Sequence, residues 1–189
     1  FRVRASKGVH IVVPRDRIVS ETAIILRTAN SVLFVIPWET HWIIGTTDTD
    51  WNLDLAHPAA THKDIDYILD RVNEVLVSPL THNDIEGVYA GLRPLLAGED
   101  DETSSLSREH AVATVAPGLI SIAGGKYTTY RVMAADAVDA CNDFIPTRVA
   151  PSITERVPLV GADGYFALIN QCEGLGERYG LHPYRVRRL

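Results

Sequence analysis

The segment LISIAGGKYTT, residues 119–129, places two glycines, one lysine and two threonines at the end of an alternating apolar run. The alternation indicates a strand, and the amphipathic segment after it indicates a helix. A strand that turns sharply into a helix presents free backbone N–H groups and the positive end of the helix dipole, which favours an anion there. Gly124 and Gly125 allow positive φ or close approach to the backbone, and Lys126 adds a charge. The pattern predicts either an anion-binding corner or two glycines that only pack the helix against the strand.

Two sharper motifs fit less well. A phosphate-binding P-loop needs G-x-x-x-x-G-K-[ST], but Ile120 stands at its first glycine position and Tyr127 at its magnesium-binding hydroxyl. Asp48 and Asp50 form a metal-like D-x-D pair, but no further acid or histidine follows at a standard spacing. We therefore expect no metal site and no P-loop.

Three further residues could take part in chemistry, although each also has a purely structural explanation. Arg93, in GLRPLL, lies between a glycine and a proline that fix the backbone, so its guanidinium suits phosphate or carboxylate, or else a surface ion pair. His10, in SKGVHIVVP, begins a strand and is either an acid or base or a structural histidine. Arg108, in LSREH, is either a basic group of a site or part of a solvated loop.

Composition limits the function classes. The net charge is −6 and the arginines are scattered singly, so we expect no nucleic-acid partner. Two distant cysteines without metal-ligand spacing indicate a reducing, cytoplasmic compartment. No apolar run approaches the roughly 20 residues that span a bilayer, which leaves peripheral membrane contact open.

The elements that must position these residues follow from periodicity and turn signals. β-branched and aromatic runs over residues 8–14, 22–28, 31–39 and 41–47 predict an antiparallel meander. Helical spacing over 61–76 predicts a helix that Thr61 caps with Asp64 and that Ser78-Pro79 ends. Further along the chain we expect a strand over 84–96, a hairpin over 110–125 with its turn at Pro117-Gly118, a helix over 127–144, a domain boundary near Ile145 and a last helix capped by Asp163. The fold class is therefore α+β.

Five blocks in this order carry a family resemblance: SKGVHIVVPR, FVIPWETHWIIGTTDTDW, GVYAGLRPLL, SREH and IAGGKYTTYRVMAADAVD. With these five blocks together, the chain resembles the later part of an FAD-dependent glycerol-3-phosphate dehydrogenase. The resemblance is to the respiratory, quinone-linked type in its actinobacterial form. The resemblance implies a mostly substrate-binding domain with an antiparallel sheet over residues 1–110. It implies a returning part of the FAD-binding α/β domain over 111–144, then a linker and the start of a C-terminal helical domain over 145–189.

The resemblance also implies roles for individual residues. Arg93 resembles the arginine that holds the substrate phosphate, and Arg108 a further basic residue of the pocket. His10 resembles the active-site histidine near the substrate hydroxyl, a candidate base when hydride passes to the flavin. Lys126 would be a second catalytic candidate, which anchors the phosphate or stabilises the flavin. The corner as a whole would lie near the isoalloxazine ring of FAD, with residues Gly124, Gly125, Lys126, Tyr127 and Thr128.

One departure from the family pattern affects the expected activity. The N-terminal strand, the G-x-G-x-x-G turn and the ribose-binding acid are absent from these 189 residues. We therefore expect a fragment that holds FAD poorly and is inactive unless the missing part is supplied. The resemblance implies three partners: glycerol 3-phosphate, a quinone, and a second copy of the chain in a homodimer. It also implies that the protein lies in the cytoplasm, at the inner face of the plasma membrane. An oxidase that reduces oxygen and a non-enzymatic phospho-ligand module remain alternatives.

Overall fold

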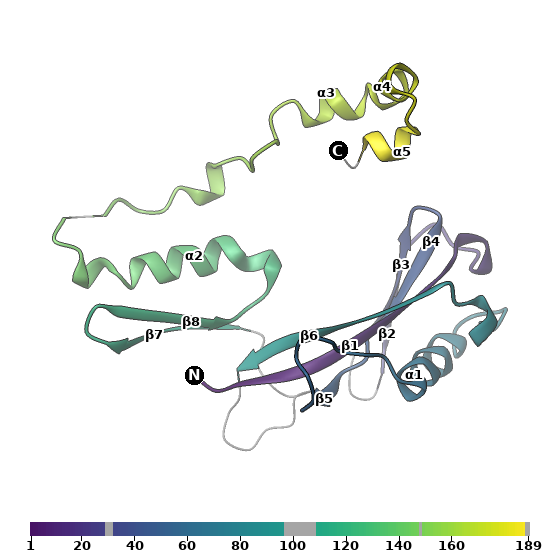
Figure 1. Cartoon of the computed structure of the whole chain (residues 1–189), viewed down its shortest axis with the longest axis horizontal. Helices are drawn as coiled ribbons and strands as arrows, with labels where there is room; N and C mark the ends of the chain where they lie inside the picture. Colours follow the sequence, from purple (N-terminus) through teal and green to yellow (C-terminus); the bar gives the residue numbers. More distant parts are fainter. Residues whose placement is uncertain (29–31, 97–108, 148, 188–189) are drawn as a thin grey trace.

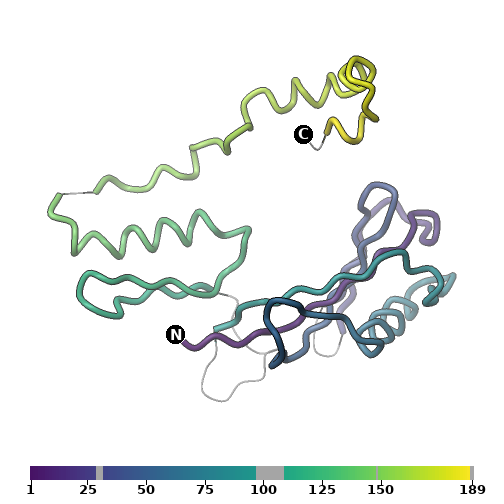
Figure 2. Tube along the Cα trace, viewed as in Figure 1, coloured from purple at the N-terminus to yellow at the C-terminus, as the bar shows by residue number. Residues whose placement is uncertain are grey.

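The computed structural model describes residues 1–28, 32–96, 109–147 and 149–187. Figure 1 shows, in chain order, a six-stranded antiparallel sheet with a helix on it, a two-stranded hairpin with a second helix along it, and a run of short helices. The tube in Figure 2 follows the same course, with the C-terminal helices lying apart from the sheet. The predicted α+β class with antiparallel sheets is confirmed.

The elements have the following bounds. The large sheet contains β1 (Val3–Pro14), β2 (Ile24–Arg27), β3 (Val32–Trp38), β4 (His41–Gly45), β5 (Thr49–Trp51) and β6 (Gly87–Leu96). The hairpin contains β7 (His110–Ala116) and β8 (Leu119–Gly124). The helices are α1 (His62–Asn73), α2 (Tyr130–Asp139), α3 (Tyr165–Ile169), α4 (Cys172–Tyr179) and α5 (Pro183–Val186), with three-residue 3-10 turns between elements.

Strand β1 is the centre of the large sheet. Its residues Val3–Val12 pair with β6 along one edge, whereas the other edge pairs with β5 at Ala5–Lys7 and with β4 at His10–Pro14. Strands β2, β3 and β4 form the expected meander. The predicted meander also placed β1 next to β2 in the sheet, and this was wrong, because β1 pairs with β4. The long apolar strand takes the position paired on both edges, and the four-residue β2, with every second residue exposed, takes an outer position.

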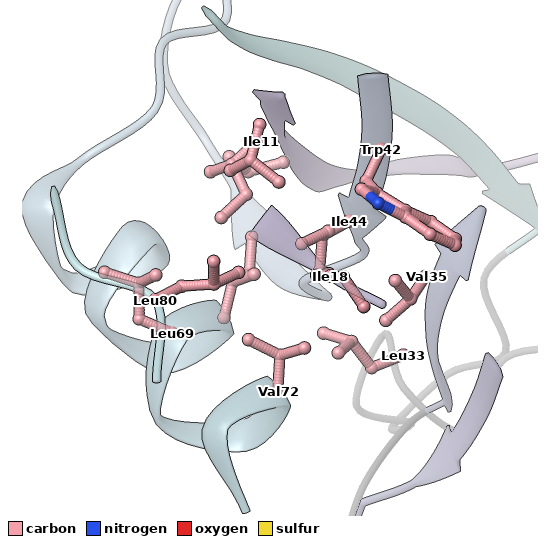
Figure 3. Packing of buried hydrophobic residues seen from close by; sticks show 12 residues of the cluster. Ile11, Ile18, Leu33, Val35, Trp42, Ile44, Leu69, Val72 and Leu80 are labelled. Atoms are coloured by element: carbon pink, nitrogen blue, oxygen red, sulfur yellow. The ribbon is translucent and has the colours of Figure 1, made fainter. Parts of the chain in front are cut away.

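Only one face of the large sheet is covered by α1. Side chains alternate along a strand, so Val9, Ile11 and Val13 of β1 point to the same face and are fully buried there. The three belong to one cluster with residues of β3, β4 and α1. Figure 3 shows Ile11 in this cluster with Leu33, Val35, Trp42, Ile44, Leu69 and Val72. The even-numbered residues of β1 lie on the opposite face.

Helix α1 begins as predicted but ends earlier. The Thr61 side chain accepts a hydrogen bond from Asp64 N, and the Asp64 carboxylate accepts one from Thr61 N, so the capping box is confirmed. The helix ends at Asn73, before the predicted Ser78-Pro79, because the Asn73 amide bonds both backbone groups of Leu80, at 2.9 and 2.7 Å, and turns the chain back.

The hairpin and α2 form a second unit. The turn at Pro117-Gly118 is confirmed, with Gly118 at φ 75°. The helix predicted over 127–144 consists of a 3-10 turn (Tyr127–Thr129), then α2, then a second 3-10 turn (Asn142–Phe144). Figure 1 shows α2 running along the hairpin.

The C-terminal segment contains three short helices. The last predicted helix is divided into α3 and α4. Asp163 does not cap it, because Gly164, at φ 77°, is the N-cap residue and makes the left-handed turn into α3. Within the four described ranges, no helix combines the length and the apolar character that crossing a bilayer requires.

A buried ion pair joins β1 to α1. Lys7 Nζ donates a 2.7 Å hydrogen bond to Asp64 Oδ2, and the two side chains are 3% and 6% exposed. Burial raises the pKa of Asp64, but the hydrogen bonds from Lys7 and Thr61, with the charge of Lys7, outweigh burial and hold the pKa below its ordinary value of 3.8. The ionised carboxylate therefore stabilises the fold.

We expect Asp64→Asn to lower the free energy of unfolding by about 3 kcal/mol, because it leaves the Lys7 charge buried without a counter-ion. The Asp64 pKa is lower in the folded state, so this loss should be complete above the unfolded pKa and shrink as the pH falls through the folded pKa. Urea denaturation from pH 7 downward measures it. The control Glu74→Gln removes the exposed ion pair between Arg71 and the C-cap residue of α1, and should cost less than about 0.5 kcal/mol. Equal costs for the two variants would contradict the account.

Candidate active site

His10 lies on the face of the sheet that α1 leaves uncovered. In the strand register it is aligned with Gly45 of β4 on one side and Tyr89 of β6 on the other. The imidazole stacks on the Tyr89 ring with centroids 5.0 Å apart and planes inclined by 11°. A Cβ on Gly45 would lie 2.5 Å from His10 Cδ2, so the imidazole occupies the space that the glycine leaves.

The His10 imidazole is neutral at neutral pH. Burial lowers its pKa below the ordinary value of 6.5, and the positive charge of Arg93 lowers it further. Among the residues that the structure describes, none makes a hydrogen bond with the ring. A neutral imidazole of this kind can accept a proton from a ligand hydroxyl.

Arg93 lies on the same face as His10, one strand away on β6. Its Nη2 donates to Thr46 Oγ1 at 2.7 Å and its Nη1 donates to the Thr47 carbonyl at 3.2 Å. The guanidinium lies across Gly8, where a Cβ would be 2.4 Å from Nη2. The predicted cation is therefore fixed by the loop after β4 and by a glycine two residues before His10.

The loop after β4 is itself held against β1. The buried Thr47 accepts a 3.0 Å hydrogen bond from Val9 N through its hydroxyl, and Asp48 accepts one from the buried Ser6 hydroxyl. The Gly45–Thr46 peptide bond is cis. Asp50 pairs with Arg4, so the two acids of the D-x-D pair have separate partners.

The predicted corner at Gly124-Gly125-Lys126 has an inner and an outer side. Gly124 and Gly125 have φ of 77° and 83°, and a Cβ on them would lie 2.6 Å from the Glu109 carbonyl and 2.5 Å from Met133 Sδ. The glycines are therefore required for packing, as the structural explanation predicts. Lys126, Tyr127 and Thr128 are exposed at the start of the helical segment.

The corner lies against the far end of β6. A Cβ on Gly124 would be 3.0 Å from Leu96 Cδ1, and Leu96 follows Arg93 by three residues. Figure 1 shows the end of β8 beside the end of β6. Within the described residues, no hydrogen bond or ion pair joins Lys126 to His10 or Arg93. The structure thus places His10 and Arg93 on one face of the sheet and brings the corner next to β6, the strand of Arg93, while Arg108 lies outside the described residues.

Sequence reasoning missed four residues of this arrangement. Thr46 and Tyr89 carry the contacts to Arg93 and His10, and Gly8 and Gly45 make room for those two side chains. The only sequence signal was a glycine inside each of two strands, which marks close approach by another group.

Comparison with known proteins shows the family. Residues 1–131 match the family described as FAD dependent oxidoreductase, which is more than half of the 189 residues, and the chain belongs to that family. The chain is 77% identical over 189 residues to glycerol-3-phosphate dehydrogenase 2 of Mycobacterium tuberculosis, covering 100% of this chain and 32% of the relative. It is 75% identical to glycerol-3-phosphate dehydrogenase of Mycobacterium leprae with the same coverage.

A solved structure agrees. The glycerol-3-phosphate dehydrogenase of Bacillus halodurans, complexed with FAD, matches with a TM-score of 0.71 and 34% identity over 98% of this chain and 37% of that chain. The resemblance to part of an FAD-dependent glycerol-3-phosphate dehydrogenase of actinobacterial form is confirmed. The chain spans about a third of the length of the curated relatives that it matches.

We expect the pKa of His10, measured by NMR titration, to lie below 6.5 and to rise in Arg93→Gln. The rise should be partial, because burial, the larger cause, remains in the variant. Arg71→Gln, which removes an arginine on α1, should leave the His10 titration unchanged. A His10 pKa that is above 6.5, or that falls in Arg93→Gln, would contradict the described electrostatics.

Proposed function

We propose that this chain forms the substrate-binding part, with a returning piece of the flavin-binding part, of an FAD-dependent dehydrogenase that oxidises sn-glycerol 3-phosphate to dihydroxyacetone phosphate. The single observation that supports this best is the pair formed by a neutral His10 and a fixed Arg93 on the sheet face opposite α1. The family and the two mycobacterial relatives support the reaction class.

The pair suits the two ends of a phosphorylated alcohol. Arg93 would bind the phosphate, because a guanidinium presents a planar set of donors that matches phosphate oxygens. Thr46 and Thr47 restrict that guanidinium before the ligand arrives, so less conformational entropy is lost on binding. His10, two residues from the Gly8 backbone that Arg93 crosses, would meet the secondary hydroxyl.

His10 would act as the base of the oxidation. As the C2–H bond breaks and its electron pair leaves as hydride, the hydroxyl proton passes to the imidazole and the C2–O bond becomes a carbonyl. A neutral imidazole is needed for this step, and burial together with the Arg93 charge keeps it neutral. FAD, when bound, supplies the hydride acceptor.

The corner fits one edge of FAD but not the whole cofactor. Three exposed residues of the corner can face a ligand: Lys126, Tyr127 and Thr128, at the N-terminal end of the segment that leads into α2. A helix N-terminus there favours negative charge at the flavin N1–C2=O edge. The inner face of Gly124 and Gly125 is filled by protein atoms. We infer that other residues of the complete enzyme bind the ribose and pyrophosphate, because these 189 residues contain no G-x-G-x-x-G turn after a strand.

Three further proposals rest on the resemblance and on element boundaries. The substrate-binding part is residues 1–110, the returning flavin-binding part is 111–144, and 145–189 opens a helical domain. The hairpin that begins at His110 and the 3-10 turn that ends at Phe144 support these limits. We propose a quinone as the electron acceptor and a peripheral site on the inner face of the plasma membrane, because the resemblance is to the respiratory type.

The test uses the complete enzyme, in which these 189 residues occupy the segment that aligns with the mycobacterial relative. Under anaerobic conditions, glycerol 3-phosphate should bleach the flavin absorbance and glycerol should not. Arg93→Gln should lower kcat/KM about 100-fold, mainly through KM, because a charged hydrogen bond to the phosphate is lost. His10→Asn should lower kcat about 100-fold or more.

Arg71→Gln is the control for the loss of an arginine and should leave both constants unchanged. A flavin that is not bleached, or a kcat/KM that Arg93→Gln leaves unchanged, would contradict the proposal. A protein that binds phosphate without flavin would favour the binding-module alternative.

A pair of glycine variants tests the geometry. Gly8→Ala places a methyl group where the Arg93 guanidinium lies, and we expect KM for glycerol 3-phosphate to rise about tenfold. Gly91→Ala is the matched control, because Gly91 is the register partner of Gly8 and a Cβ there meets nothing within 4 Å. A Cβ on Gly8 would also lie 2.6 Å from Thr46 Oγ1, so Gly8→Ala displaces both side chains, and urea denaturation of both variants separates a change in stability from the change in KM. An unchanged KM in Gly8→Ala would show that the position of Arg93 is irrelevant to substrate binding.

A further inference from the structure

Three neighbouring strands place Gly45, His10 and Tyr89 in one row across the sheet. The two flanking residues limit the His10 imidazole in different ways. On the β4 side the ring lies so close over Gly45 that a Cβ would meet both Cγ and Cδ2, at 2.8 and 2.5 Å. On the β6 side the Tyr89 ring lies nearly parallel to it, at an inclination of 11°.

We propose that Tyr89 is a positioning residue for His10: its ring confines the imidazole over Gly45 so that the same ring edge meets the substrate hydroxyl in every turnover. This inference rests on the proposed function of His10 as the base. It assigns a role to a residue that touches the imidazole and acts through it.

The contact is with the Tyr89 ring and not with its hydroxyl. Within the described residues the phenol makes no hydrogen bond, and burial raises its pKa above 10.0, so the hydroxyl stays protonated at neutral pH. Stacked aromatic pairs at this centroid separation contribute beyond the area that they bury. A phenylalanine at position 89 would therefore preserve the effect, and an aliphatic residue would not.

Tyr89 also contributes to the environment of the imidazole. Burial is the larger cause of the lowered pKa of His10, and the stacked ring covers one side of the imidazole. Removing it admits water to that side, so the pKa should rise toward 6.5. A base with a raised pKa is protonated at higher pH, so the acidic limb of the kcat/KM profile should move to higher pH.

The experiment compares Tyr89→Leu with Tyr89→Phe in the complete enzyme. For Tyr89→Leu we expect kcat to fall about tenfold, KM for glycerol 3-phosphate to change less than about threefold, and the acidic limb to move upward. Tyr89→Phe should behave like the parent. In the His10→Asn background, Tyr89→Leu should have no further effect, because its action passes through the imidazole.

A second readout is independent of activity. In the flavin-free protein, NMR titration should give a higher His10 pKa in Tyr89→Leu than in the parent and in Tyr89→Phe. A Tyr89→Leu enzyme with unchanged kcat, pH profile and His10 pKa would overturn the inference alone, provided that His10→Asn is impaired. An equal fall in kcat from Tyr89→Leu with and without His10 would also overturn it, as a general structural effect. Full activity of His10→Asn would overturn the proposed base and this inference together.

Discussion

Side chains alternate between the two faces of a β-strand, and in β1 both faces are in use. Its odd-numbered residues Val9, Ile11 and Val13 anchor the core under α1, and this leaves Gly8 and His10 on the other face. A shift of the register by one residue would bury the imidazole beneath α1 and expose the core. The site and the core are therefore fixed by the same strand pairing, with β6 on one edge and β4 and β5 on the other.

The charges of the two faces are handled differently. On the covered face, Lys7 is buried with Asp64 as its counter-ion, which links β1 to the capping box of α1. On the other face, Arg93 is held by the hydroxyl of Thr46 and the carbonyl of Thr47. Its charge lowers the pKa of the nearby His10, although less than burial does. One arrangement can thus present a cation for an anionic group and a neutral base for a hydroxyl.

Much of the fold could be predicted because it depends on local signals. The Thr61 capping box, the turn at Pro117-Gly118 and the alternation of the strands are all encoded within a few residues. The position of β1 beside β4 was missed. The order of strands in the sheet depends on which strand is long and apolar enough to pair along both of its edges, and no local signal shows that. The division of the last helix was missed as well.

His10 and Arg93 were each predicted as candidate site residues, but their arrangement on one face was not predicted. His10 and Arg93 are 83 positions apart in sequence, and only the β1–β6 register brings them onto one face. Tyr89 and Thr46 gave no signal of their own, because their importance comes from what lies opposite them across the sheet. At the two-glycine corner the inner side packs against protein atoms, as the structural explanation predicts, whereas the outer side is exposed and its anion binding stays a prediction.

The most direct measurement is a crystal structure of the complete enzyme with dihydroxyacetone phosphate bound. The central claim is that Arg93 binds the phosphate of a ligand molecule and His10 contacts the C2 oxygen of the same molecule. It predicts phosphate oxygens within hydrogen-bond distance of the Arg93 guanidinium, and the C2 oxygen within hydrogen-bond distance of a ring nitrogen of His10. A ligand bound with its phosphate away from Arg93, or with C2 remote from the imidazole, would contradict the account.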